Sequence, residues 1–256
     1  PLYVEVDQIY HLACPASPVH YQLDPVQTVK TNVHGTINVL GLAKQARARI
    51  LQASTSEVYG TARYVPIDEA HPLQGQSPYS ASKIAADKLA EAFSCSFDLP
   101  VVTVRPFNTF GPRQSARAVI PTIMTQCLTG ETVRLGNLRP IRDLNFVDNI
   151  VEGLLAAAES SDAVGQTINL GSGREISIQD LARLIASLTE REMEIVQQLE
   201  RCRPEKSEVD RLLADNSLAK SLLKWQPRIS LEEGLEKTLS WFTEHLDEYQ
   251  PEVYTL

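Results

Sequence analysis

Tyr79-Ser80-Ala81-Ser82-Lys83 is the stretch on which our prediction of the fold and of the chemistry rests. Tyr79 and Lys83 stand just over one turn apart at the start of a predicted helix, so their side chains project from the same side. A cation beside a phenol favours the ionised form and lowers a pKa that is normally about 10. Such a tyrosine can take a proton from a substrate hydroxyl near neutral pH. The helix is expected to continue with one buried face, made of Ala85, Leu89, Ala92 and Phe93.

The composition is that of an ordinary globular protein with one large domain or two closely joined ones. Hydrophobic residues make up 43% of the 256 residues and charged residues 22%. The net charge of −8 argues against a nucleic-acid-binding surface. We expect no membrane span and, at residues 1–7, no signal peptide. The four cysteines lack the spacing of metal ligands and predict reduced thiols in a cytoplasmic protein.

The first half of the chain alternates predicted strands with predicted helices. Strands are expected at residues 8–13, 49–54 and 101–105, and a helix opens at Asp24-Pro25 between the first two. This succession predicts an α/β fold with a doubly wound parallel sheet and helices on both of its faces. One side of the first helix is expected to be buried through Val26, Val29, Val33, Ile37 and Leu40.

Ligands of such sheets bind beyond the carboxyl ends of the strands. The functional candidates there are Ala13-Cys14, Thr55-Ser56-Glu57 and Pro106-Phe107-Asn108, one group after each predicted strand. The spacing of Tyr79 and Lys83 also arises by chance on exposed helices, but these groups converge on the same crevice. We therefore favour a functional site.

The second half is more irregular and predicts a smaller mixed domain that leans over the crevice. A polar loop is expected at residues 139–143 and a strand at 167–170. The expected helices run over residues 118–129, 147–158, 177–188 and 230–245, the last two opened by Ser177 with Asp180 and by Ser230 with Glu233.

Five segments together resemble the extended short-chain dehydrogenase/reductase family, specifically its nucleotide-sugar epimerases, dehydratases and decarboxylases. The segments are 11–14, 54–60, 79–83, 105–113 and 142–148, and the resemblance covers essentially the whole chain. It implies a Rossmann-like dinucleotide-binding domain over residues 1–110 with 147–171, and a nucleotide-sugar substrate domain over 111–146 with 172–256. It also implies NAD as cofactor, and a homodimer formed through the helices that begin near Asp24 and Ser80.

The same resemblance implies the roles of individual residues. Tyr79 is the expected base at the sugar 4-hydroxyl, Lys83 lowers its pKa and binds the nicotinamide ribose, and Thr55 shares the bond to the 4-oxygen. Glu57 is the fourth expected catalytic residue. The expected cofactor contacts are Leu12, Ala13, Cys14, Ser54, Tyr79, Lys83, Pro106 and Phe107. The expected substrate contacts are Ser56, Asn108, Arg117, Arg142 and Arg203, of which arginine suits a diphosphate.

Glu57 bears on which reaction follows oxidation at the sugar C4. A carboxylate there can remove the acidified C5 proton, which favours a 4,6-dehydratase and argues against a simple 4-epimerase. A UDP-glucuronate decarboxylase remains the alternative, because Thr55-Ser56-Glu57 resembles that enzyme too. Residues 1–60 look more like the decarboxylases, and the sequence from Thr61 onward looks more like the dehydratases. We favour the dehydratase, with the base and the sugar left open.

The family begins with a glycine-rich turn, GxxGxxG, that holds the cofactor pyrophosphate, and this sequence has none. Residue 1 matches a point before the family's fourth strand, so roughly 60 residues are expected to be missing. As a truncated form the chain is expected to bind dinucleotide poorly and to expose a sheet edge. A hypothesis of a different class follows, namely a catalytically silent module for binding or dimerisation.

Overall fold

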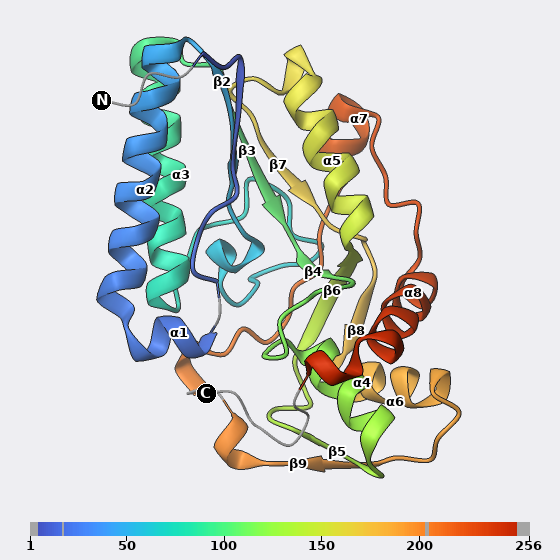
Figure 1. The fold of residues 1–256 in the computed structure, drawn as a ribbon. Coiled ribbons are helices and arrows are strands. Elements are labelled where there is room, and N and C mark those ends of the chain that lie inside the picture. Colours follow the sequence, from blue (N-terminus) through green and yellow to red (C-terminus); the bar gives the residue numbers. More distant parts are fainter. Residues whose placement is uncertain (1–4, 17, 203–204, 250–256) are drawn as a thin grey trace.

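The computed structural model describes residues 5–16, 18–202 and 205–249. Its central sheet has four parallel strands in the order β1-β2-β3-β7 (Figure 1). The strands are β1 (Gln8–His11), β2 (Arg49–Ala53), β3 (Val101–Pro106) and β7 (Thr167–Leu170). The predicted α/β fold with a parallel Rossmann-like sheet is thus confirmed.

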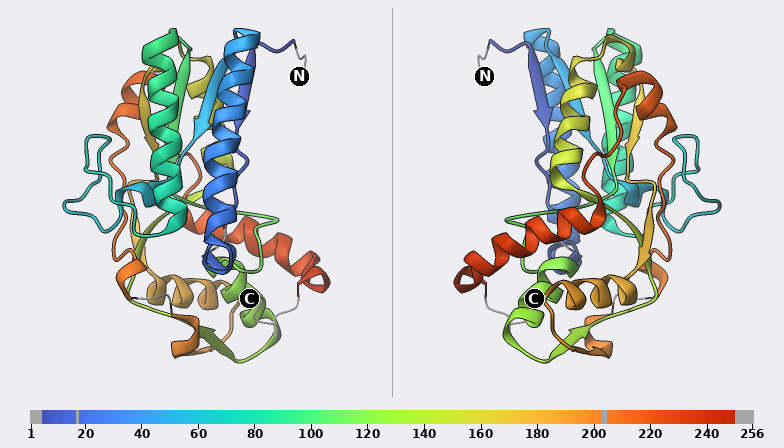
Figure 2. Two further views of the ribbon diagram at one scale, coloured as in Figure 1. Left: turned by 90° about the vertical axis from the view of Figure 1, so that its left-hand side faces the viewer. Right: turned by 90° about the vertical axis from the view of Figure 1, so that its right-hand side faces the viewer.

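Helices cover both faces of the sheet. On one face α2 (Pro25–Ala46) and α3 (Pro78–Phe97) lie side by side, preceded by the short α1 (Pro18–Leu23) (Figure 2). On the other face α5 (Val147–Glu159) and α7 (Ser217–Leu223) pack against the strands. Asp24 caps α2 by accepting a hydrogen bond from the backbone of Gln27, as predicted, and Ser77 caps α3.

The predicted buried faces of α2 and α3 are only partly correct: Leu40 is buried, and Leu89 and Phe93 are half-buried against the same core. Val26, Val29 and Ile37 of α2 are 62%, 38% and 42% exposed. Besides Leu40, the side of α2 that packs against the molecule carries Thr28, Asn32, Thr36 and Ala43. In α3 the predicted Ala92 is exposed, and the buried side carries Tyr79, Lys83, Ala86, Asp87 and Ala90. The two helices pack closely through small and polar side chains, for which hydrophobic periodicity gives no signal.

The remaining elements form a smaller lobe at the carboxyl ends of the strands (Figure 1). One sheet joins β4 (Asn108–Phe110), β6 (Ile141–Phe146) and β8 (Glu175–Ser177), and β5 (Thr132–Leu135) pairs with β9 (Glu194–Gln197). The helices α4 (Val119–Thr129), α6 (Ile178–Leu188) and α8 (Leu231–Glu244) share one apolar core with them. The predicted division into domains stays a prediction. Ala219 and Trp225 of its second part pack with the large sheet, and Phe110 of its first part packs in the core of the smaller lobe.

The polar loop predicted at residues 139–143 is wrong in its second half, because Ile141, Arg142 and Asp143 open the strand β6. Asp143 is fully buried and accepts hydrogen bonds from the backbone N–H groups of Ser172, Gly173 and Ala214. A carboxylate satisfied in this way can occupy a buried strand, whereas its sequence signature is that of a loop.

Candidate functional site

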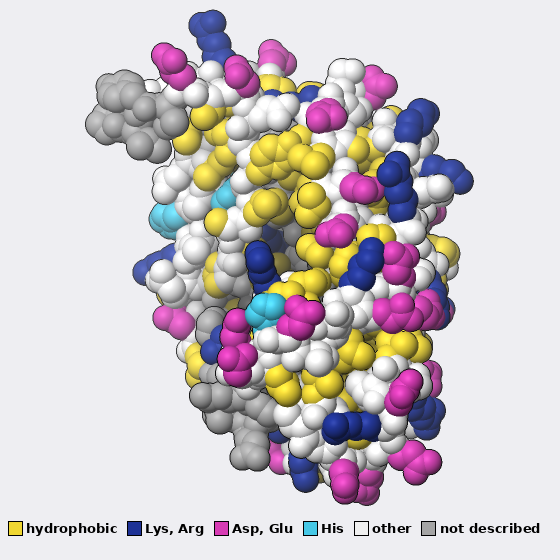
Figure 3. All heavy atoms as spheres, turned by 45° about the vertical axis from the view of Figure 1, so that its right-hand side comes forward, with side chains coloured by type: hydrophobic (Ala, Val, Ile, Leu, Met, Phe, Trp, Pro, Cys, Tyr) yellow, Lys and Arg dark blue, Asp and Glu magenta, His cyan; other side chains and the backbone are white. Residues whose placement is uncertain are grey.

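The segments that follow β1, β2 and β3 meet at the carboxyl edge of the sheet, where the first turn of α3 also lies. Figure 3 shows the molecular surface hollowed between the large sheet and the smaller lobe. The structure brings Cys14, Thr55, Glu57 and Tyr79 together at this edge. This convergence is the one predicted from the order of strands and helices.

Tyr79 lies at the centre of this group and is only 6% exposed. Its hydroxyl forms hydrogen bonds with the side chains of Thr55 and Cys14. Its ring stacks on that of Tyr21, with the ring centres 5.6 Å apart and the planes 8° from parallel. Tyr21 comes from α1, and nothing in its sequence context pointed to this contact. The phenol is therefore fixed on one side by a ring and at its tip by a hydroxyl and a thiol.

The predicted lowering of the Tyr79 pKa by Lys83 is not what the structure shows. Burial raises the pKa of Tyr79 well above its ordinary value, and the neighbouring Cys14 and Glu57 raise it further. The Lys83 ammonium instead donates a hydrogen bond to the carbonyl oxygen of Ala53 at 2.6 Å. In this state the phenol keeps its proton, and removal of that proton requires additional positive charge at the site.

Glu57 belongs to a short 3-10 helix, Ser56–Tyr59, that follows β2. Thr55 caps this helix, and its hydroxyl accepts a hydrogen bond from the Glu57 backbone N–H at 3.3 Å. The same hydroxyl bonds to Tyr79, so one side chain links the carboxylate-bearing segment to the phenol. The half-buried Glu57 carboxylate is close enough to raise the pKa of Tyr79. These are the geometric relations that a shared acid–base site requires.

The residues predicted to contact a cofactor differ in how accessible they are. Leu12 and Ala13 are exposed just beyond β1, and Pro106 is half-buried at the end of β3. The Ser54 hydroxyl is used within the protein, because it donates to Asp87 at 2.8 Å. The Phe107 ring is buried against Tyr59. Since these two side chains are used within the protein, Ser54 and Phe107 would contact a cofactor through their backbone atoms.

The residues predicted to contact substrate are only partly brought together. Asn108 is half-buried, and its Oδ1 is buried without a hydrogen-bond partner, as expected of an atom that awaits a ligand. The Arg142 guanidinium forms an ion pair with Glu208 at 3.1 Å. Ser56 is buried, whereas Arg117 is exposed in the segment before α4. Arg203 lies outside the described residues.

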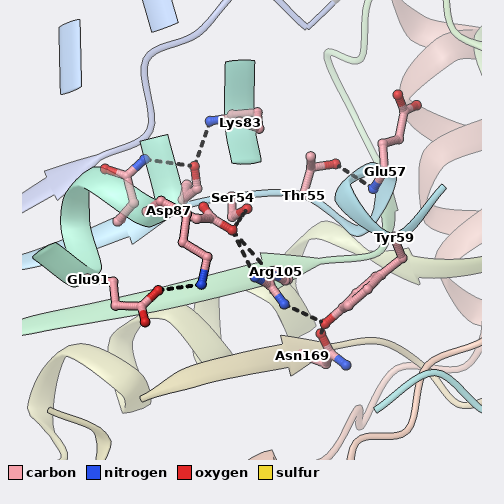
Figure 4. A network of polar contacts seen from close by, with 12 residues as sticks. Ser54, Thr55, Glu57, Tyr59, Lys83, Asp87, Glu91, Arg105 and Asn169 are labelled. Carbon is pink, nitrogen blue, oxygen red and sulfur yellow. Dashed lines mark hydrogen bonds and ion pairs between the residues drawn. The ribbon is translucent and has the colours of Figure 1, made fainter. Parts of the chain in front are cut away.

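A buried polar network adjoins the site, and sequence reasoning missed it. Arg105 lies between Asp87 and Tyr59, and the chain of contacts continues to Asn169 on β7 (Figure 4). The signal that could have found it is an arginine that closes the apolar run of β3, together with an aspartate one helical turn after Lys83. A charged side chain in such positions requires a partner.

Asp87 and Arg105 also line a cleft of about 650 Å³ between α3, β3 and the start of β7. Neither Tyr79, Lys83, Thr55 nor Glu57 lines it, so this cleft is separate from the candidate site. Among the residues that the structure describes, no group of three or more His, Cys, Asp or Glu side chains is arranged to hold a metal ion. Within the same residues, no helix has the length and apolar character of a membrane span.

The comparisons with known proteins agree with this architecture. A family model described as GDP-mannose 4,6 dehydratase matches residues 3–238. The chain therefore belongs to this family of nucleotide-sugar-modifying extended short-chain dehydrogenases/reductases.

Curated relatives of high similarity are decarboxylases. UDP-glucuronic acid decarboxylase 1 of Xenopus tropicalis is 40% identical over 255 residues, which are 96% of this chain and 59% of the relative. The Arabidopsis thaliana protein of the same name is 39% identical over 94% of this chain and 56% of the relative. The chain thus spans somewhat more than half the length of these relatives.

Solved structures with the same fold act on several nucleotide sugars. The UDP-glucose 4-epimerase of Thermotoga maritima, solved with UDP-glucose, has a TM-score of 0.87 at 30% identity. The aligned region covers 94% of this chain and 78% of the epimerase chain. The dTDP-glucose 4,6-dehydratase of Bacillus anthracis, in complex with NAD, has a TM-score of 0.84 at 27% identity. The aligned region covers 96% of this chain and 75% of the dehydratase chain.

Proposed function

We propose that this chain carries the catalytic residues of an NAD-dependent nucleotide-sugar enzyme that acts through a 4-keto intermediate, and that it decarboxylates UDP-glucuronate. The observation that carries the proposal is the hydrogen-bonded group of Thr55, Glu57 and Tyr79 at the carboxyl edge of the sheet. The choice of decarboxylation is supported by relatives of that name at 37–40% identity. A dehydratase is the prediction from the sequence alone, and the decarboxylase relatives do not support it.

Each residue has a role that its position supports. Tyr79 accepts the proton of the sugar 4-hydroxyl, and Thr55, already bonded to Tyr79, holds the 4-oxygen beside it. The buried Lys83 supplies positive charge to this end of α3. Once C4 is a ketone, the carboxylate on C5 is β to it and leaves as CO₂. The electron pair of the broken bond forms an enolate, and we expect Glu57 to pass the proton that C5 then takes up.

The residues present fit the nicotinamide half of NAD. Leu12 and Ala13 are exposed just beyond β1 and Pro106 is half-buried at the end of β3, whereas the sequence has no glycine-rich turn for the pyrophosphate. When bound, NAD would accept the hydride from C4 and return it to C4 after CO₂ has left, and its cationic ring would favour loss of the Tyr79 proton, whose pKa is raised. We expect Asn108, through its unpartnered oxygen, and Arg142 to bind the sugar nucleotide.

Dehydration is the second candidate, and Glu57 is the observation that favours it. Removal of the C5 proton by a carboxylate is required for loss of the 6-hydroxyl, and it is not required for loss of CO₂. The two reactions therefore differ in how much they depend on Glu57. A 4-epimerase requires neither step and is the third candidate.

The test is a panel of sugar nucleotides incubated with the chain and NAD, with the product mass measured for each. Loss of CO₂ from UDP-glucuronate is expected, and loss of water from a dTDP- or GDP-hexose would establish a dehydratase instead. Unchanged mass with inversion at C4 would identify an epimerase. If no sugar nucleotide reacts, even when the segment that precedes residue 1 in the relatives is supplied, the alternative of a catalytically silent module gains its support. The cytoplasmic location stays a prediction.

We also propose a homodimer in which α2 and α3 of two copies form a four-helix interface. The exposed apolar side chains of α2, Val26, Val29 and Ile37, support this arrangement because they leave a hydrophobic stripe in water. Light scattering should give the mass of a dimer for the wild type and that of a monomer for Val29→Glu. A monomeric wild type would contradict the proposal.

A further inference from the structure

The segment from Ser54 to Tyr59 carries both Thr55 and Glu57, and the protein holds it at its two ends. At the first end, the Ser54 hydroxyl donates to Asp87 Oδ2 at 2.8 Å. At the other end, Arg105 Nη1 donates to the Tyr59 hydroxyl at 3.0 Å. The buried side chains of Asp87 and Arg105 thus form hydrogen bonds with the two ends of the segment that carries Thr55 and Glu57.

Asp87 and Arg105 are also hydrogen-bonded to each other. Arg105 donates through Nε and Nη2 to the same oxygen, Asp87 Oδ2, at 3.2 and 3.0 Å. Both side chains are about 95% buried, since each residue is 5% exposed. The planar guanidinium fixes the directions of its N–H groups, so the bond to Asp87 also aims Nη1 at Tyr59. A buried ion pair gives little net stability relative to apolar packing. We therefore explain the pair by the fixed directions of the Arg105 N–H groups rather than by stability.

Asp87 also ties the segment to the helix that bears the base. Tyr79, Lys83 and Asp87 follow one another at four-residue intervals on the buried side of α3. The hydrogen bond from Ser54 to Asp87 therefore fixes the position of the segment along the axis of α3. Tyr79 lies on the same side of this helix, about two turns before Asp87. Tyr59 in turn donates to Asn169 Oδ1 at 2.7 Å, which anchors the far end to β7 (Figure 4).

We propose that Asp87 and Arg105 are positioning residues, which hold the segment 54–59 against α3 so that Thr55 and Glu57 face Tyr79. For its catalytic meaning the inference rests on the proposed function, whereas the mechanical part stands on the contacts alone. Both residues are buried and line the separate cleft rather than the candidate site, so their effect on the reaction passes through Thr55 and Glu57.

Arg105→Lys is the sharpest perturbation, because lysine keeps the positive charge beside Asp87 and cannot reach Tyr59 at the same time. Tyr59→Phe releases the far end of the segment alone and serves if the lysine variant fails to fold. Ile185→Ala, in the core of the smaller lobe, is the control for a general loss of stability.

Hydrogen exchange tests the mechanical part without reference to activity. The backbone N–H groups of Glu57, Val58 and Gly60 form hydrogen bonds within the segment or its cap. In Arg105→Lys and Tyr59→Phe the peptide that contains them should exchange at least roughly tenfold faster, with the α3 peptide much less affected. Unchanged exchange there, or an equal acceleration in Ile185→Ala, would overturn the inference.

A double-mutant cycle tests the catalytic part. With UDP-glucuronate and NAD, Arg105→Lys should lower kcat on the order of 100-fold and leave KM within about threefold, because misplaced groups are lost mainly in the transition state. In a Glu57→Gln background the same change should cost less, since one of the two groups that Arg105 positions is already gone. Fully additive losses would overturn the role in positioning. If the wild type turns over no sugar nucleotide, the proposed function fails, and the exchange result alone decides the inference.

Discussion

Asp143 should contribute far more to stability than an ordinary aspartate, because its carboxylate closes the turn that follows β7. Its Oδ1 accepts from the Ser172 backbone N–H at 2.7 Å and from the Ser172 hydroxyl at 2.6 Å. Its Oδ2 accepts from Gly173 at 3.0 Å and from Ala214 at 3.1 Å. The variant Asp143→Ala therefore leaves three backbone donors without their acceptor: that of Ala214 is buried, and those of Ser172 and Gly173 are partly buried.

Each buried donor without a partner costs about 1–3 kcal/mol, and partial entry of water lowers the total. We expect Asp143→Ala to lower the free energy of unfolding by about 3–5 kcal/mol. Asp143→Asn should lose less, about 2 kcal/mol, because the amide retains one acceptor oxygen and the Ser172 hydroxyl can turn to accept from its NH₂.

Urea denaturation followed by circular dichroism measures these differences at constant pH. The matched control is Asp180→Ala on α6, whose carboxylate is 60% exposed and should matter by less than about 1 kcal/mol. A loss below about 1 kcal/mol for Asp143→Ala would refute the reasoning, since it would mean that water satisfies all three donors.

Three further predictions concern the site. Glu57→Gln should lower kcat on the order of 100-fold or more if Glu57 exchanges the C5 proton, and unaltered product formation would contradict that role. Arg142→Gln should raise the KM for the sugar nucleotide with little change in kcat, provided that the guanidinium leaves Glu208 for the diphosphate. Burial, and then the charge of Lys83, lower the pKa of His11 below 6.5. The unfolded chain therefore takes up this proton first, so stability should fall as the pH drops below 6.5, and His11→Gln should flatten that slope in urea titrations.

The sheet was predictable because its strands carry a strong local signal. The apolar runs at Ile50–Leu51 and Val101–Val104, separated by helical stretches, are sufficient to predict a parallel sheet. The ends of those runs then place Thr55, Glu57 and Tyr79 at one edge, because all parallel strands end on the same side.

What the sequence did not reveal are contacts that join distant segments. The high pKa of Tyr79 depends on burial under Tyr21 and beside Cys14, and periodicity measures neither. The sequence around Asp143 predicts a loop rather than a buried strand, because its partners Ser172 and Ala214 come from far along the chain. The side of α2 that faces the protein is only partly predictable for the same reason: Leu40 is apolar and buried, but the close contact with α3 uses Asn32 and Ser82 rather than large apolar groups.

In the sequence, only the Glu57 carboxylate bears on the choice between dehydration and decarboxylation, and this residue alone does not decide it. Glu57 serves dehydration directly, yet it is also compatible with decarboxylation, and the surrounding motif is shared. Only similarity over the whole chain, at 40% identity to a decarboxylase, moves the preference.

The central claim is that the Tyr79 phenol removes the proton that allows hydride to leave the sugar C4. The most direct measurement is single-turnover absorbance of the reduced nicotinamide after UDP-glucuronate is mixed with Tyr79→Phe and NAD. We expect no reduced cofactor from the variant and a clear transient from the wild type, with sugar-nucleotide binding nearly equal in the two. A transient of wild-type size from Tyr79→Phe would contradict the account.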